Sequence, residues 1–156
     1  MEKRFDIESA LPGAYRAVAA LHKFVKDLPF EPLLLELVHM RASQINGCAY
    51  CLDMHSKDAR ALGETEQRLY TLSAWRETPF FTPRERAALA FTEAVTLIAD
   101  AHVPDDVLTE VQRHFSPSEV AGLLLAITQI NVWNRWSIIQ GTVPGSYTRP
   151  VGQLAG

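Results

Sequence analysis

Apolar residues recur along most of the chain at the three- and four-residue spacing of amphipathic helices, and no stretch alternates as a β-strand does. This pattern predicts an all-α protein, a bundle of about seven helices. The ranges expected to be helical are 12–27, 32–46, 48–62, 64–75, 83–101, a segment around 107–111, and 117–140. Residues 1–10 are expected to form a loose arm, and the residues after Gly141 a tail without regular structure.

Turn and capping residues set the boundaries of these helices. Asn46-Gly47 is expected to end the second helix, and Gly63 is placed to end the third in a left-handed cap. Thr82-Pro-Arg-Glu85 and Ser116-Pro-Ser-Glu119 are capping boxes with proline at the first helical position. The last helix begins apolar on every side, which is typical of a helix at the centre of a packing. The Cys-x-x-Cys motif then lies at the N-terminus of the third helix.

Composition narrows the class of protein. The 156 residues are 47% hydrophobic and 21% charged, which predicts one soluble globular domain over 1–156, with its core at 30–140. A net charge of -3, with Lys and Arg scattered among acids, provides no basic patch for nucleic acid. The longest apolar run, 120–127, is too short to span a bilayer, and no apolar signal segment follows Met1. We therefore expect a cytoplasmic protein that binds neither nucleic acid nor membrane.

Both cysteines of the chain lie close together, at Cys48 and Cys51. In a reducing cytoplasm two cysteines at this spacing are seldom a structural crosslink, so the pair favours redox chemistry or metal binding. With His55 they follow i, i+3, i+7 spacing and share one face of a helix. The first turn of a helix favours a thiolate, and His55 is four residues beyond Cys51, where it can take the thiol proton.

Helix geometry adds Glu36 to this group. If Asn46-Gly47 joins two antiparallel helices, Glu36 lies roughly 15 Å and His55 roughly 13 Å from the turn, so the two can face each other. A carboxylate that accepts a hydrogen bond from imidazole fixes its tautomer and raises its basicity. The predicted relay runs from Glu36 to His55 to Cys51, with Cys48 close enough to form a disulfide afterwards.

Other interpretations of the cysteine pair stay open. The cysteines are inert core residues in one of them. In another they form half of a structural zinc site with His55 and either His39 or Glu36, although zinc ligands usually come from two segments. In a third the chain is a redox-sensing or disulfide-exchange protein that is oxidised reversibly without peroxidase turnover.

Several further residues are expected to be structural. His22 and His39 are interpreted as surface or partly buried helix positions. Asn131 and Asn134 interrupt an apolar helix and need hydrogen-bond partners, for which another subunit is a candidate. The aromatic side chains expected in the core or in subunit contacts, in preference to a substrate pocket, are Trp75, Phe80, Phe81, Trp133 and Trp136.

A family resemblance rests on the spacing of these residues. Glu36 is followed after eleven residues by Cys48-Ala-Tyr-Cys51, and His55 follows after three more. This stretch resembles the signature of the alkylhydroperoxidase D (AhpD) proteins, within the carboxymuconolactone decarboxylase-like superfamily. The resemblance extends over 30–139 and includes the segments Ser43-Gln-Ile-Asn-Gly47, Asp53-Met-His55, Gly63-Glu-Thr65, Thr82-Pro-Arg-Glu-Arg86 and Asn131-Val-Trp-Asn-Arg135.

The resemblance implies an all-helical homo-trimer or homo-hexamer that acts as an antioxidant alkylhydroperoxidase, or as a disulfide reductase. By position, it makes Cys51 the thiol that attacks the peroxide, Cys48 the resolving thiol, and Glu36 with His55 the proton relay. No bound cofactor is implied. An external dithiol or a disulfide reductase resets the site, and a peroxiredoxin is a further candidate partner.

One residue departs from the family pattern. The best-studied branch has a histidine where this chain has Tyr50. A tyrosine, with a pKa near 10, cannot serve as a base at neutral pH but can donate a hydrogen bond, so Tyr50 is a candidate auxiliary residue. Decarboxylase members of the superfamily do not depend on a cysteine pair, and the pair here argues against lactone decarboxylation.

Overall fold

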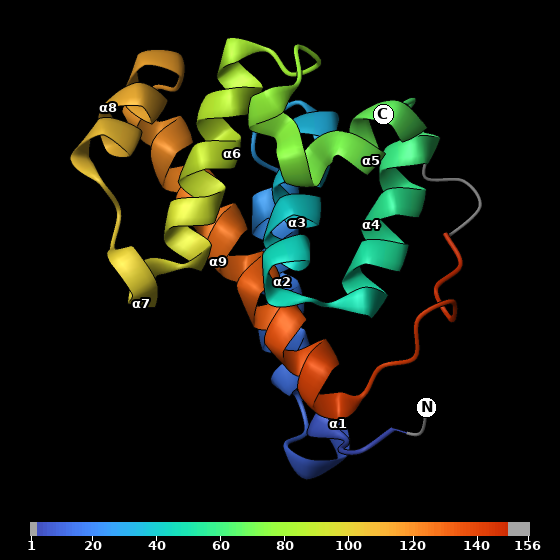
Figure 1. The fold of residues 1–156 in the computed structure, drawn as a ribbon. Helices are drawn as coiled ribbons and strands as arrows, with labels where there is room; N and C mark the ends of the chain where they lie inside the picture. Colours follow the sequence, from blue (N-terminus) through green and yellow to red (C-terminus); the bar gives the residue numbers. More distant parts are fainter. Residues whose placement is uncertain (1–2, 150–156) are drawn as a thin grey trace.

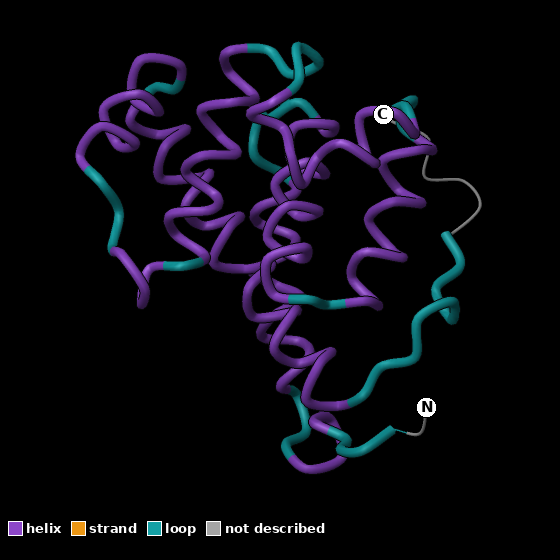
Figure 2. Tube along the Cα trace, viewed as in Figure 1, coloured by secondary structure: helices purple, strands orange, loops and turns teal. Residues whose placement is uncertain are grey.

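The computed structural model describes residues 3–149, which are helical and contain no β-strand (Figure 2). The all-α prediction is therefore confirmed. None of the helices in the described part is long and apolar enough to cross a membrane. In chain order the elements are α1 (Ile7–Ala10), α2 (Ala14–Lys26), α3 (Pro32–Asn46), α4 (Ala49–Ala61), α5 (Glu66–Thr71), the 3-10 helix η1 (Leu72–Glu77), α6 (Pro83–Thr96), α7 (Ile98–Ala101), α8 (Asp105–His114) and α9 (Pro117–Gln140).

Helix α3 lies at the centre of the fold and packs against α4, α6 and α9 (Figure 1). Two groups of buried apolar side chains meet on it. Val38 belongs to the group shared with α2, α6, α8 and α9, and Leu37 to the group shared with α4, α5, η1 and α6. Because each such side chain contributes about 1.5–3 kcal/mol on full burial, these two groups hold α3 and its neighbours in place.

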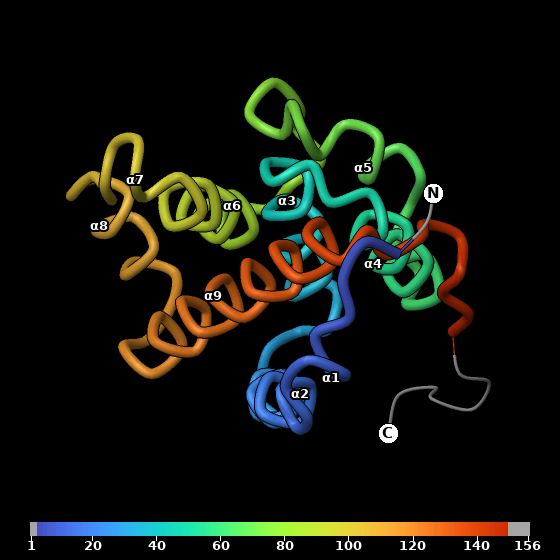
Figure 3. The backbone as a smooth tube through the Cα atoms, turned by 90° about the horizontal axis from the view of Figure 1, so that it is seen from below, coloured from blue at the N-terminus to red at the C-terminus, as the bar shows by residue number. Residues whose placement is uncertain are grey.

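Helix α9 crosses the molecule and contacts α2, α3, α4, α6 and α8 (Figure 3). Its predicted central position is confirmed. The amide nitrogen of Asn134 donates to Ser43 Oγ at 3.0 Å, and that of Asn46 donates to the side-chain oxygens of Asn131 and Asn134 at 2.9 Å each. Asn131 and Asn134 therefore find hydrogen-bond partners within the same chain, because the polar end of α3 reaches them.

The number of helices differs from the prediction, since the described residues contain nine α-helices and one 3-10 helix. The expected loose arm contains α1, which Asp6 caps by accepting a hydrogen bond from the Ser9 N–H. The cysteine pair consequently lies at the start of α4, not of the third helix. The predicted helices 64–75 and 83–101 are each divided. The first changes to the 3-10 helix η1 after Thr71, and the second ends at Leu97; both residues adopt backbone angles outside the α-helical range, which apolar spacing does not record.

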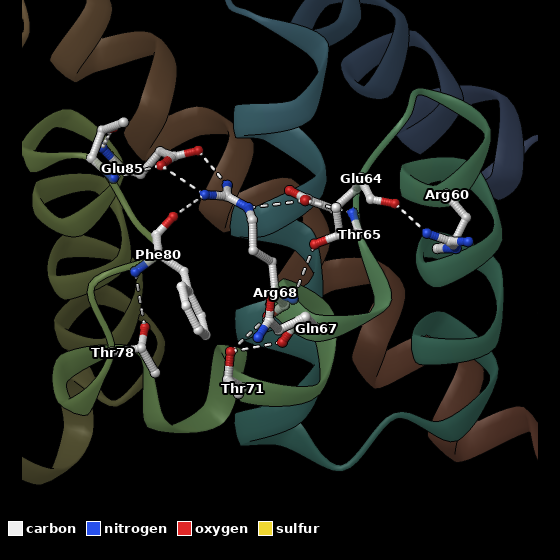
Figure 4. A network of polar contacts seen from close by, with 10 residues as sticks. Arg60, Glu64, Thr65, Gln67, Arg68, Thr71, Thr78, Phe80 and Glu85 are labelled. Atoms are coloured by element: carbon white, nitrogen blue, oxygen red, sulfur yellow. Dashed lines mark hydrogen bonds and ion pairs between the residues drawn. The ribbon is translucent and has the colours of Figure 1, made fainter.

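A cluster of ion pairs connects the loops between α4 and α6 (Figure 4). Arg68 Nε donates to Glu64 Oε1 at 2.9 Å, its Nη2 donates to Glu85 Oε1 at 2.6 Å, and its Nη1 donates to the Phe80 carbonyl. Glu85 also completes the capping box of Thr82 at the start of α6. We call Glu64, Arg68 and Glu85 the Arg68 cluster. Through it, Arg68 on α5 is bonded both to the loop that precedes α6 and to the first turn of α6.

The segment after α9 has no regular structure up to residue 149, as predicted, and runs alongside α4 (Figure 1). Tyr147 donates its hydroxyl hydrogen bond to Asp58 Oδ1 at 3.0 Å, and the Gly145 N–H donates to Asp53 Oδ2 at 2.9 Å. Both acceptors belong to α4. These contacts hold the outer face of the helix that carries the cysteine pair.

Candidate functional site

The turn between α3 and α4 places both cysteines at the beginning of α4. Gly47 has φ 67° and ψ 32°, a left-handed conformation that suits glycine and ends α3. Cys48 is the N-cap of α4, and its Sγ accepts a hydrogen bond from the Cys51 N–H at 3.3 Å. The first turn of α4 presents unpaired N–H groups and the positive end of the helix dipole, which stabilise a thiolate when the cysteines are reduced.

Cys48 and Cys51 are joined by a disulfide, with their Cα atoms 5.3 Å apart. Each side chain is only 1% exposed. The pair therefore lies close enough for the oxidised form that the sequence predicts, and only a small part of its surface is open to a reactant.

Glu36 and His55 meet across the α3–α4 pair, as the turn geometry predicts. His55 Nδ1 lies 2.8 Å from Glu36 Oε2, and the side chains are 5% and 16% exposed. With the carboxylate as acceptor, Nδ1 carries the proton and Nε2 keeps its lone pair. His55 Nε2 is buried and has no hydrogen-bond partner among the described residues. It is therefore available to accept a proton on the helix face where Cys51 lies one turn away.

Burial decides the protonation of this site. Loss of hydration lowers the pKa of His55 to about 4 and raises the pKa of Glu36 above its usual value. His55 is therefore neutral near pH 7, the state in which an imidazole accepts a proton.

His39 is placed differently from the sequence expectation of a surface or partly buried position. It is 4% exposed, and its ring centroid lies 4.7 Å from that of His55. Neither ring nitrogen has a hydrogen-bond partner among the described residues, and burial lowers the pKa of His39 to about 3. The expectation fails because neighbouring helices cover α3 on several sides. The sequence feature that could have predicted its place in the site is its position three residues after Glu36, because this spacing puts both side chains on one face of a helix.

A cavity of about 280 Å³ adjoins Cys51 and His55. Residues of α2, α4 and α9 line it, and they include Tyr15, Tyr50, Gln129, Trp133 and Trp136. Tyr15 lies 5.7 Å from Trp133 and 5.4 Å from Trp136 between ring centroids, so the three form one aromatic wall.

The aromatic expectations hold only in part. Trp75 and Phe81 are buried in the core as predicted, whereas Trp133 and Trp136 line this cavity instead. Sequence reasoning missed Tyr15 and Gln129 as cavity residues, since no motif links α2 and α9 to the cysteines.

Tyr50 is half-buried and faces this cavity. Burial raises its pKa further above the usual value near 10. The hydroxyl is therefore protonated at neutral pH, and it can offer a hydrogen bond to a molecule in the cavity. His22 also lines the cavity and is half-buried, as expected, and its Nδ1 lies 3.1 Å from Gln129 Nε2.

A family model for the carboxymuconolactone decarboxylase family matches residues 12–94, which include α2, α3, α4 and the whole Glu36–His55 stretch. The chain belongs to this family. Within it the protein is AhpD-like, as its similarity to solved structures indicates.

Two relatives cover nearly all of this AhpD-like chain. The uncharacterized protein YdfG of Bacillus subtilis (strain 168) is 42% identical over 141 residues, which are 90% of this chain and 96% of YdfG. The crystal structure of ATU0492 from Agrobacterium tumefaciens, a protein of unknown function proposed to be the antioxidant defence protein AhpD, has a TM-score of 0.89 and 39% identity. It covers 94% of this chain and 100% of its own.

A structure of lower sequence identity shares the same fold. The debrominase Bmp8 shares a TM-score of 0.78 at 22% identity, with 88% of this chain and 74% of its own covered. At this identity the likeness concerns the fold alone. The family is named after a decarboxylase, so membership supports an enzyme without specifying its reaction.

Proposed function

We propose that this AhpD-like protein is a thiol-dependent peroxidase that reduces alkyl hydroperoxides through Cys51 and Cys48. The observation that carries the proposal is the hydrogen bond between Glu36 and His55, which leaves the buried Nε2 of a neutral imidazole without a partner, one helical turn after Cys51 on α4. Such an arrangement of carboxylate, imidazole and thiol activates a nucleophile.

The first half of the cycle consumes the hydroperoxide. In the reduced protein His55 Nε2 takes the proton of the Cys51 thiol, and the thiolate attacks the outer oxygen of the substrate. The S–O bond forms as the O–O bond breaks, so Cys51 becomes a sulfenic acid and the peroxide is reduced by two electrons. The departing alkoxide takes the proton from His55 and leaves as an alcohol. Glu36 stabilises the imidazolium that exists between these two proton transfers.

The second half restores the thiols. The sulfur of Cys48 attacks the sulfur of the Cys51 sulfenic acid, the S–S bond forms, and hydroxide leaves with the Cys48 proton as water. An external dithiol then reduces the disulfide by two exchange steps and becomes a disulfide itself. The 5.3 Å separation of the two Cα atoms supports the resolving step, because it lies within the range that disulfides require.

The cavity supports an organic substrate. Its aromatic wall and its volume of about 280 Å³ suit an apolar group attached to the hydroperoxide. The protonated Tyr50 hydroxyl is a donor for one of the peroxide oxygens. Tyr50 would thus assist binding or departure of the alkoxide, while His55 alone serves as the base.

The proposal includes the surroundings of the reaction. The protein requires no bound cofactor; its reductant is a dithiol or a disulfide reductase, with a peroxiredoxin as another candidate, and the cytoplasm is the compartment that sustains such a cycle. A homo-trimer or homo-hexamer is proposed from the family resemblance. Sedimentation equilibrium of the purified protein measures this assembly directly.

Counting thiols during a single turnover tests the assigned roles. One equivalent of an organic hydroperoxide should consume two thiols per chain in the reduced wild type. In Cys48→Ser it should leave a sulfenic acid at residue 51, which dimedone traps and mass spectrometry locates. An unreacted wild-type pair would overturn the peroxidase, and a sulfenic acid at Cys48 in a Cys51→Ser variant of equal reactivity would reverse the two roles.

Steady-state turnover separates the peroxidase from a redox sensor or disulfide-exchange protein. Under excess dithiol the peroxidase consumes many equivalents of hydroperoxide, whereas a sensor is oxidised once per reduction without sustained consumption. Elemental analysis of the reduced protein addresses the zinc site built on cysteines, since stoichiometric zinc that Cys48→Ser removes would count against the peroxidase.

A further inference from the structure

Three potential metal ligands converge beside the cysteine pair. Glu36 and His39 come from α3 and His55 from α4, and one ligand atom from each lies within 4.8 Å of the others. We call these residues the His-His-Glu cluster. Two of them belong to the proposed proton relay, whereas His39 has no part in it.

His39 is the member that the relay leaves unexplained. It is 4% exposed, yet both of its ring nitrogens lack a hydrogen-bond partner among the described residues. His55 Nε2 is buried and unpartnered in the same way. Buried polar atoms nearly always have a partner, and a neutral imidazole without one has one unprotonated nitrogen whose lone pair is available to a cation.

We propose that Glu36, His39 and His55 bind one Zn²⁺ ion, or a divalent ion of similar chemistry, without any contribution from the cysteines. Two imidazoles and one carboxylate are a donor set that Zn²⁺ accepts, and such three-ligand sites leave a position for water. Ligands at about 2.0–2.2 Å in a tetrahedron are roughly 3.4 Å apart, so ligand atoms that now lie within 4.8 Å of one another need to close by at most about 1.4 Å.

Metal binding and the proton relay exclude each other. An ion held by His55 Nε2 occupies the lone pair that would receive the Cys51 proton. Zn²⁺ should therefore slow the oxidation of Cys51 reversibly, and a chelator should restore it. This consequence rests on the proposed function, whereas the binding itself does not.

Calorimetric titration of the oxidised protein with Zn²⁺ tests the site. The intact Cys48–Cys51 disulfide removes both thiols as ligands, so binding of one ion per chain must come from other groups. Co²⁺ should bind likewise, without the charge-transfer absorption that thiolate ligands produce. Oxidised wild-type protein that binds neither ion would overturn the proposal.

Variants of His39 identify the ligands. His39→Leu should weaken Zn²⁺ binding by more than about 100-fold, because loss of even an outer-shell partner weakens metal sites by about 10–100-fold. His39→Gln retains polarity and should show the same loss, and it replaces the first variant if leucine prevents folding. The matched control is His114→Ala, which removes a half-buried histidine that contacts Glu110 at 3.1 Å on α8. Undiminished binding in both His39 variants, or loss in the control, contradicts the assignment.

The same variants keep the two proposals distinguishable. His39→Gln should retain hydroperoxide reduction and become insensitive to Zn²⁺, because His39 takes no part in the relay. If the wild type binds Zn²⁺ but lacks peroxidase activity, the proposed function fails and the metal site stands. If hydroperoxide reduction proceeds and oxidised wild type binds no Zn²⁺, the metal site fails alone.

Discussion

Two clusters of buried polar side chains connect helices in this protein, and their hydrogen bonding differs. In the Arg68 cluster the guanidinium donates to two carboxylates and to the Phe80 carbonyl (Figure 4). In the His-His-Glu cluster only one side-chain pair, Glu36 and His55, is bonded, and three ring nitrogens have no partner among the described residues. Both clusters are largely buried. The Arg68 cluster leaves one carboxylate oxygen, Glu64 Oε2, without a partner among the described residues, whereas the His-His-Glu cluster leaves all three of these ring nitrogens.

This difference separates a structural cluster from a reactive one. Charges that are paired and hydrogen-bonded offset the loss of hydration, so the Arg68 cluster can hold α5 against α6 without reacting. Buried imidazoles with lowered pKa values and unpartnered nitrogens are retained at the expense of stability, which is common at functional sites. The position of the cysteine pair beside the second cluster agrees with this distinction.

Replacement of the attacking sulfur is the strongest test of the contrast. Cys51→Ser should abolish hydroperoxide turnover with a dithiol donor, because a hydroxyl cannot form the sulfenic acid or the disulfide. Arg68→Met should retain turnover per folded molecule. The measurement is hydroperoxide consumption under excess dithiol, and full activity in Cys51→Ser would contradict the proposed reaction.

The same chemical change in each cluster gives a matched pair. Glu36→Gln should slow the oxidation of Cys51 by about 100-fold or more, since it removes the group that orients His55 as a base. Glu85→Gln, in the Arg68 cluster, should leave this rate unchanged. Stopped-flow oxidation of the reduced proteins measures both, and equal rates in the two variants would remove the relay from the mechanism.

The free energy of unfolding should depend more on the Arg68 cluster than on an exposed ion pair. Arg68→Met should lower the free energy of unfolding by about 2–3 kcal/mol, because Glu64 is left buried without its partner; the 20% exposure of Arg68 keeps the loss below that of a fully buried pair. Arg113→Met removes an exposed ion pair with Glu110 and should change it by less than about 0.5 kcal/mol. Urea denaturation measures both. Equal losses would mean that the Arg68 cluster contributes no more than a surface pair.

The aromatic wall of the cavity allows a test of substrate preference at the reactive site. Trp133→Ala should lower kcat/KM for a bulky organic hydroperoxide about ten-fold, the usual effect of a lost apolar contact, and should change that for hydrogen peroxide little. Tyr70→Ala, an exposed aromatic residue outside the cavity, is the control. An equal loss for both peroxides would place Trp133 in the structure of the protein and not in substrate selection.

Local patterns in the sequence determined much of the fold. The capping boxes at Thr82 and Ser116 begin α6 and α9 as predicted, because a cap depends on residues within one turn of each other. Gly47 and the rise of the helix were enough to predict that Glu36 meets His55, since a short turn between helices leaves little freedom. Both cysteines lie at the N-terminus of α4 because Gly47 ends α3 immediately before Cys48.

Tertiary structure alone decided the features that depend on what covers each helix. Apolar periodicity shows that α3 has a buried face, but the burial of His39 follows from the helices that pack around α3. The breaks at Thr71 and Leu97 follow from the backbone angles of single residues, and Tyr15 and Trp133 join the cavity from helices distant in sequence. The sequence by itself therefore determined the helices and the reactive pair. The packing decided which lone pairs and which aromatic side chains surround that pair, because burial is a property of contacts between elements that no single element contains.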